Sequence, residues 1–240
     1  MTELVRYADR PDLREIRHEV LSRATFPEYM HHNVPGNLYW GSLYDEHPDF
    51  QLALVDGGEL VAEVHSVPTP WDGTDEDLPS GWDEAFRRAF ESGRGADVLC
   101  ALALSVRPDR QGTHLSSFMI ETMCDAARAA RLRELIAPVR PTLKDRYPLI
   151  PIEEYVEWRR DDGGHFDPWI RIHERLGGTI LAPGPCSMRI EAPVASWEEW
   201  TEMQFPADGD YVVPGMLAPL VVRDGTGVHV EPNVWLRHVL

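Results

Sequence analysis

Two residues that could move protons, Glu63 and His65, lie two positions apart in the alternating stretch 60–67. Successive side chains of a strand point to opposite faces, so these two share one face with Val67. If that face lines a cleft, either side chain is a candidate general base. The alternative is that the face meets water, or that neighbouring groups satisfy both side chains.

A polar turn at residues 107–114 follows the almost entirely apolar run 98–106 and precedes the segment 115–131. The apolar run is typical of a strand buried on both faces. Apolar residues then recur at helical spacing, which predicts a helix. A strand, a turn and a helix start in this order place backbone N–H groups at the positive end of a helix dipole. The sequence therefore predicts an anion site, such as one for a pyrophosphate, at this turn.

Other elements surround this strand–turn–helix unit. Residues 51–55 and 60–67 are expected to form a hairpin across Asp56-Gly57-Gly58, and a further strand is expected at 134–139. Helices are predicted at 152–160 and 169–176, and a closing hairpin is predicted near the C-terminus. The simplest organisation is one α/β domain, with residues 1–190 forming its body and residues 191–240 an extension packed on the same domain.

The charge balance excludes some partners. The 240 residues include 40 acidic and 23 basic side chains, a net charge of −17. Nucleic acids and anionic membrane surfaces are bound by basic faces, so neither is an expected partner. The three cysteines lack metal-ligand spacing and predict no disulfide framework. Since the N-terminal segment has no apolar signal core and no run is long enough to cross a bilayer, a cytoplasmic protein is expected.

The strand–turn–helix unit resembles the Gcn5-related N-acetyltransferase (GNAT) superfamily. The pattern of that family is an apolar strand, Val-x-Pro, and then Arg/Gln-x-x-Gly-x-Gly/Ala opening a helix. Val106-Arg107-Pro108 and Gln111 fit this pattern. His114 stands where the family usually has its middle glycine, and Ser116 where it has its last small residue. The later run 173–178 is similar to the family's Tyr-Glu-Lys-Leu-Gly-Phe signature.

The resemblance implies a fold and a cofactor site. The fold would be a mixed central sheet, mostly antiparallel with a splayed parallel pair, flanked by helices. Acetyl-CoA, or another acyl-CoA, would be the co-substrate, and its pantetheine arm would pair with the backbone of Leu104, Ser105 and Val106. Its pyrophosphate would be held by the backbone N–H groups of Gln111, Gly112, Thr113, His114, Leu115 and Ser116.

The resemblance also implies acyl transfer to the amine of a small molecule by direct attack, with no metal and no covalent intermediate. His173 falls where many members carry a tyrosine proposed to protonate the leaving thiolate. An imidazole can shuttle protons near neutral pH, which makes His173 a candidate acid, with a structural histidine as the alternative. Glu63 and His65 are the candidate bases.

Other functions of such a fold stay open at this point. One is O-acyl transfer or transfer from a carrier-protein thioester, and another is a non-catalytic module that binds acyl-CoA. An acyl-enzyme on Cys100 or Cys186 is a minor option, because neither cysteine has a recognisable basic partner. The sequence leaves the oligomeric state open, with a homodimer among the options.

Overall fold

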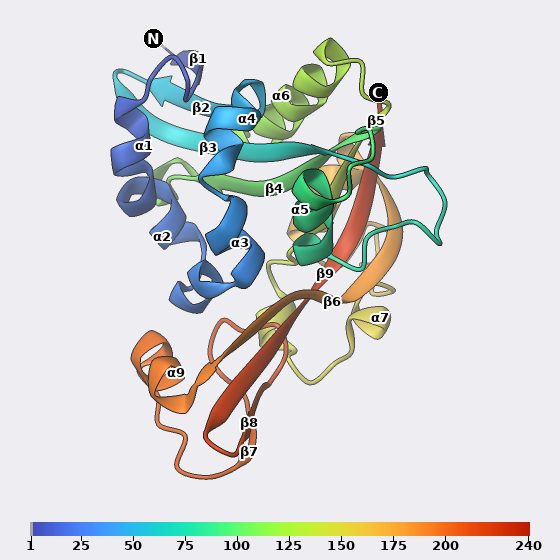
Figure 1. Ribbon diagram of the computed structural model, residues 1–240. Coiled ribbons are helices and arrows are strands. Elements are labelled where there is room, and N and C mark those ends of the chain that lie inside the picture. Colours follow the sequence, from blue (N-terminus) through green and yellow to red (C-terminus); the bar gives the residue numbers. More distant parts are fainter. Residues whose placement is uncertain (1) are drawn as a thin grey trace.

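A computed structural model describes residues 2–240 and is organised around one mixed sheet of nine strands (Figure 1). The strands are β1 (Thr2–Arg6), β2 (Gln51–Asp56), β3 (Glu59–Thr69), β4 (Val98–Val106), β5 (Glu134–Val139), β6 (Thr179–Pro193), β7 (Gly209–Tyr211), β8 (Leu220–Arg223) and β9 (Thr226–Val239). The hairpin predicted at 51–67 is confirmed as β2 and β3, and the predicted strands at 98–106 and 134–139 are β4 and β5.

The strand order is β1-β2-β3-β4-β5-β9-β8-β7, with β6 paired to β9. Neighbours pair antiparallel except β4 and β5, which run parallel and pair at only two positions, Leu99 with Leu135 and Cys100 with Ile136. Beyond Cys100 the two strands separate. The predicted GNAT-like sheet with a splayed parallel pair is therefore confirmed.

Helices cover both faces of the sheet. They are α1 (Asp12–Arg17), α2 (Arg23–Thr25), α3 (Val34–Tyr39), α4 (Ser42–Glu46), α5 (Trp82–Glu91), α6 (Leu115–Ala129), α7 (Ile152–Tyr155), α8 (Pro168–Arg175) and α9 (Val194–Thr201). Residues of α6 and α8 pack in one apolar cluster with Leu99, whereas α5 packs in another with Cys100 and Leu102. Because successive residues of β4 point to opposite faces, these clusters lie on opposite sides of the sheet.

The segments between α1 and α4 are short and irregular. A π-helical turn (His18–Ser22) joins α1 to α2, and a 3₁₀ turn (Glu28–His32) precedes α3. Further 3₁₀ turns occupy Pro48–Phe50, Pro108–Arg110 and Lys144–Arg146. Pro27 and Pro35 lie at two of these boundaries, since proline favours the first helical position and cannot continue a helix. In Figure 1 this blue segment lies on the same side of the sheet as α5.

The C-terminal residues complete the sheet. Strand β9 lies next to β5 through residues 234–239, and it pairs with β6 along most of its length. The far halves of β6 and β9, with α9, β7 and β8, form an arm that Figure 1 shows below the main sheet. The helix predicted at 152–160 is shorter, because only Ile152–Tyr155 is helical and an irregular segment follows. Within residues 2–240, no helix combines the length and apolar character that crossing a membrane requires.

Candidate acyl-transfer site

The separation of β4 from β5 leaves one edge of β4 open. Leu104, Ser105 and Val106 pair with β3 on one side, and no residue of β5 pairs with them on the other. Free N–H and C=O groups along an open strand edge can pair with an extended ligand. The three residues predicted to pair with a pantetheine arm therefore lie on an edge that can do so.

The turn between β4 and α6 has the backbone that its glycine pattern anticipates. Gly112 has φ 76° and His114 has φ 65°, both in the left-handed region. His114 thus adopts the conformation that glycine takes most readily, with its side chain exposed to solvent. Residues 111–114 are all exposed, and the first N–H groups of α6 have no partner within the helix. The turn that the sequence predicts to bind an anion is therefore exposed to solvent.

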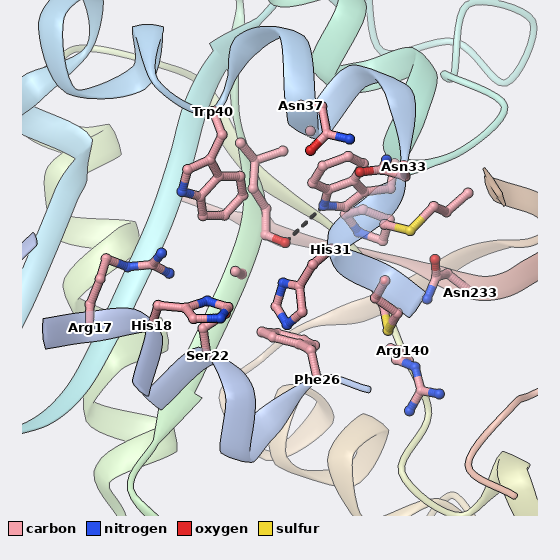
Figure 2. A pocket seen from close by; sticks show the side chains of 17 residues that line it. Arg17, His18, Ser22, Phe26, His31, Asn33, Asn37, Trp40, Arg140 and Asn233 are labelled. Atoms are coloured by element: carbon pink, nitrogen blue, oxygen red, sulfur yellow. Dashed lines mark hydrogen bonds between the residues drawn. The ribbon is translucent and has the colours of Figure 1, made fainter. Parts of the chain in front are cut away.

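A cavity of about 360 Å³ lies where the open edge of β4 faces the segment from α1 to α4 (Figure 2). Its floor includes Leu102 and Ala103 of β4 and Pro138 of β5, so it reaches both strands of the splayed pair. Trp82 Nε1 donates to Leu102 O at 2.8 Å and anchors α5 beside the gap. The remaining lining residues are Arg17, His18, Ser22, Phe26, Met30, His31, Asn33, Gly36, Asn37, Trp40, Arg140, Met188 and Asn233.

The lining is cationic and aromatic. Its ionisable residues are two arginines and two histidines, and none of the residues that line the cavity is a carboxylic acid. Figure 2 shows Arg17 and Arg140 on opposite sides of the labelled group, with His18 and His31 between them. Each arginine is supported from behind by a fully buried glutamate.

Arg17 is supported by Glu63. The guanidinium donates from Nε to Oε2 at 2.8 Å and from Nη2 to Oε1 at 2.7 Å. Tyr7 also donates to Glu63, at 2.5 Å, and His65 Nε2 lies 3.1 Å from the same carboxylate. Burial opposes ionisation of Glu63, but His65 and Arg17 outweigh it and lower its pKa to about 2.

His65 is also enclosed by neighbouring groups. Its Nδ1 lies 3.0 Å from Gln51 Oε1, and burial lowers its pKa. Glu63 and His65 are therefore brought together, as their shared strand face predicts, but neither lines the cavity. Neighbouring groups form hydrogen bonds with both side chains, which is the alternative that the sequence left open for them. Glu63 is connected to the cavity lining through its ion pair with Arg17.

Arg140 is supported in the same way by Glu231 of β9. Its Nε donates to Glu231 Oε1, and its Nη2 donates to Gly215 O at 2.5 Å and to Tyr29 at 3.3 Å. His229 Nε2 lies 2.5 Å from the other oxygen of Glu231. Arg140 and Glu231 are 91 residues apart in the sequence, so only the fold brings this pair together.

His173 lies on the opposite side of the sheet from the cavity helices. It is 2% exposed, its ring packs against Trp169, and its Nδ1 is 2.9 Å from His238 Nε2. Burial and His238 lower its pKa to about 3. The other nitrogen, Nε2, is buried and has no hydrogen-bond partner among residues 2–240. Trp169 and Ala101 of β4 pack against the same two apolar clusters, so α8 lies over this part of the sheet.

His31 is a candidate that the sequence did not single out for proton transfer. Its Nε2 is buried and unpartnered within residues 2–240, and its ring lies edge-on to that of His18 at 5.1 Å. Burial, with a smaller effect from His18, lowers the pKa of His31. The adjacent pair His31-His32 is visible in the sequence. Only the fold shows that His31 enters the cavity while His32 stacks on Trp200 instead.

Comparisons with known proteins agree with this geometry. No protein-family model matches the chain. The arginine N-acetyltransferase avaD of Aspergillus versicolor is 29% identical over 271 residues, covering 96% of this chain and 91% of that protein. The loading GNATL domain of CurA from Lyngbya majuscula has a TM-score of 0.62 at 16% identity, covering 100% of this chain and 98% of that one. The GNAT-like decarboxylase GphF in complex with isobutyryl-CoA has a TM-score of 0.57 at 16% identity, with the same coverage.

The two solved structures are too distant in sequence to show more than the fold. That fold has the splayed β4–β5 pair and the β4–α6 turn, and the avaD relative spans almost the whole chain. The chain therefore has a GNAT-like fold, and its sequence is similar over almost its whole length to that of an arginine N-acetyltransferase.

Proposed function

We propose that the protein transfers the acetyl group of acetyl-CoA to the amine of a small molecule such as arginine, by direct attack on the thioester. The observation that supports this most strongly is the continuity of the cavity with the splayed gap, through Leu102, Ala103 and Pro138. An acyl group carried along the open edge of β4 would emerge at the cavity floor. An amine held in the cavity would then lie beside it, and such positioning is a large part of catalysis.

The donor would be bound by backbone groups. In this proposal the open edges of Leu104, Ser105 and Val106 pair with the pantetheine arm. The N–H groups at the start of α6, around His114 and Ser116, face the pyrophosphate, where the helix dipole favours negative charge.

His31 is the proposed general base. A lowered pKa leaves its imidazole neutral at pH 7, so the unpartnered Nε2 can accept the proton that the attacking ammonium must lose. His18 lies between His31 and solvent, because its side chain is exposed while its ring contacts that of His31. The proton can leave through this pair. Glu63 and His65, proposed as bases from the sequence, are better suited to positioning Arg17.

His173 is the proposed partner of the leaving thiolate. With a pKa of about 3 it is neutral at pH 7, so it would stabilise the thiolate by a hydrogen bond rather than as a charged acid. His31 and His173 would then approach the thioester from opposite faces of the sheet. In the balanced reaction the amine nitrogen forms the amide bond and the carbon–sulfur bond breaks. The nitrogen loses two protons: the first goes to His31 before the attack, and the second leaves the tetrahedral adduct as the amide forms. One of the two is released to solvent, and the other is balanced by the proton that the thiolate takes up.

Incubation of the purified full chain with acetyl-CoA and a panel of amines, including arginine, tests the proposal. The expected result is amine-dependent release of coenzyme A together with an N-acetylated product seen by mass spectrometry. Because Cys186 is exposed, a blank without amine corrects any thiol assay. Binding of acetyl-CoA without transfer to any amine would overturn the proposal and favour the non-catalytic module. Transfer to alcohols or from carrier thioesters alone would favour the other acyl reactions.

A further inference from the structure

Arg140 leaves part of its guanidinium free at one end of the cavity. Its Nε and Nη2 are engaged by Glu231, Tyr29 and Gly215, whereas Nη1 has no hydrogen-bond partner among residues 2–240. The side chain is 22% exposed and lines the cavity. One nitrogen of a guanidinium that other groups hold in place therefore keeps its hydrogens available to a ligand. A guanidinium held in this way is suited to carboxylates.

The charges around Arg140 favour an anion. The carboxylate of Glu231 is fully buried and pairs with Arg140. The Lys144 ammonium feels the charge of this carboxylate, while it donates hydrogen bonds to Tyr147 O and Leu217 O. Burial lowers the pKa of Lys144 to about 8, so most of the lysine stays protonated at pH 7. Two cations against one carboxylate leave an excess of positive charge near this end of the cavity, where Arg140 is the cation that lines it. The opposite end lacks this excess, because Arg17 is matched by Glu63.

A second donor lies beside Arg140. Asn233 is 5% exposed, lines the cavity, and its side-chain amide forms no hydrogen bond with residues 2–240. Because it forms no such bond, the amide is available to a ligand that enters the cavity. Figure 2 shows Asn233 and Arg140 on the same side of the labelled group, and the pairing of Val139 with Val234 places both residues at the same end of the β5–β9 ladder. No carboxylic acid lines the cavity to compete for these donors.

We propose that Arg140 and Asn233 bind a carboxylate of the acceptor, so that the enzyme acts on amino acids with a free carboxylate in preference to the corresponding decarboxylated amines. This inference rests on the proposed function and specifies its acceptor class. The acetyl donor carries no carboxylate that could fill the same place. A carboxylate on a different acyl group is the competing source, and the experiment separates the two.

The decisive comparison is arginine against agmatine, which has the same amine and guanidine groups and lacks only the carboxylate. We expect kcat/KM to be about 10- to 100-fold higher for arginine, the range that one charge-assisted hydrogen bond supplies. Argininamide, which keeps the size of arginine without the negative charge, should resemble agmatine. Equal kcat/KM values for arginine and agmatine would overturn the inference while leaving the proposed function intact.

A double variant links the preference to Arg140. R140Q/E231Q removes both charges together, so no buried carboxylate is left unpaired. We expect its ratio of kcat/KM values, arginine over agmatine, to fall to about one. The control R189Q/E191Q removes an exposed ion pair of β6 and should keep the wild-type ratio. Because a ratio cancels any loss of folded enzyme, a wild-type ratio in R140Q/E231Q would contradict the proposal.

Two further measurements cover the remaining outcomes. If no amine is acetylated, calorimetric titration of the protein–CoA complex with arginine and with agmatine still tests the carboxylate. Tighter binding of arginine supports the subsite, and equal binding overturns it, independently of catalysis. If succinyl-CoA is preferred to acetyl-CoA and R140Q/E231Q removes that preference, the carboxylate belongs to the acyl donor, which also overturns the inference.

Discussion

Glu63 and Arg17 form a two-point ion pair in which a carboxylate with no exposed surface supports a guanidinium at the cavity wall. The two hydrogen bonds measure 2.8 and 2.7 Å, and the side chains are 0% and 11% exposed. Two nearly parallel bonds fix the plane of the guanidinium as well as its position. Glu63, which the sequence suggested as a general base, instead holds Arg17 in place at the cavity wall.

Removing the charge of Glu63 should destabilise the fold. We expect Glu63→Gln to lower the free energy of unfolding by about 3–5 kcal/mol, because Arg17 is left buried without its counter-charge. Urea denaturation followed by circular dichroism measures the change. Glu19→Gln is the matched control, since Glu19 pairs with Arg23 on the surface, and its effect should stay below about 1 kcal/mol. Similar midpoints for the two variants would contradict the buried role of Glu63.

The same pair should give a recognisable acid response. The pKa of Glu63 is about 2 in the folded protein against 4.5 for the unperturbed group. A lowered pKa contributes stability above the unfolded value, and that contribution is lost as the pH falls from 4.5 toward 2. The stability difference between wild type and Glu63→Gln should therefore be constant from pH 7 to about 5 and shrink below it. A difference that stays constant down to pH 3 would count against the depressed pKa.

The sequence predicts the strands better than the cavity. The hairpin of β2 and β3 and the β4–α6 unit follow from local period and turn residues, which the fold retains. The partners of the site are long-range. Arg17 meets Glu63 across 46 residues, and Arg140 meets Glu231 across 91. The segment from α1 to α4 has no regular spacing of apolar residues, because prolines and short helical turns interrupt it. No local pattern could therefore show that His31 points into the cavity.

His31 and His32 are adjacent and differ in surroundings, which makes them a matched pair. We expect His31→Gln to lower kcat/KM about 100-fold or more, the usual contribution of a general base. His32→Gln should have little effect, since His32 contacts Glu28 and Trp200 outside the cavity lining. Steady-state kinetics with the best acceptor measures both. Equal losses in the two variants would point to a structural effect of this 3₁₀ turn.

The pH profile of the wild type carries further information on His31. Because burial lowers its pKa below the ordinary 6.5, the base should remain unprotonated through pH 7. The acidic limb of kcat for the acceptor should therefore lie below pH 6.5, and activity should be lost as the pH falls through it. In His31→Gln this limb should disappear. A limb that persists there unchanged would belong to another group.

Replacing His173 should affect the rate more than donor affinity. His173→Phe keeps a planar ring against Trp169 but removes the unpartnered Nε2. If that nitrogen stabilises the thiolate, kcat should fall by about 10-fold or more, while the Kd for acetyl-CoA changes little. His238→Phe is the companion variant, since His238 contacts only the other nitrogen of His173. Loss of donor affinity without a loss of kcat in His173→Phe would exclude this role.

Glycine at position 114 should leave donor binding intact. His114 already has the left-handed φ of 65°, and its exposed side chain forms no hydrogen bond with residues 2–240. His114→Gly keeps the backbone and removes the imidazole, so the affinity for coenzyme A should be unchanged or rise by a few fold. His114→Val forces a β-branched residue into this region, which costs about 1–2 kcal/mol and should weaken binding as the turn distorts. Isothermal titration with coenzyme A compares the three proteins. A clear drop for His114→Gly would instead mean that the imidazole itself contacts the cofactor, and the turn would then owe part of its affinity to a side chain.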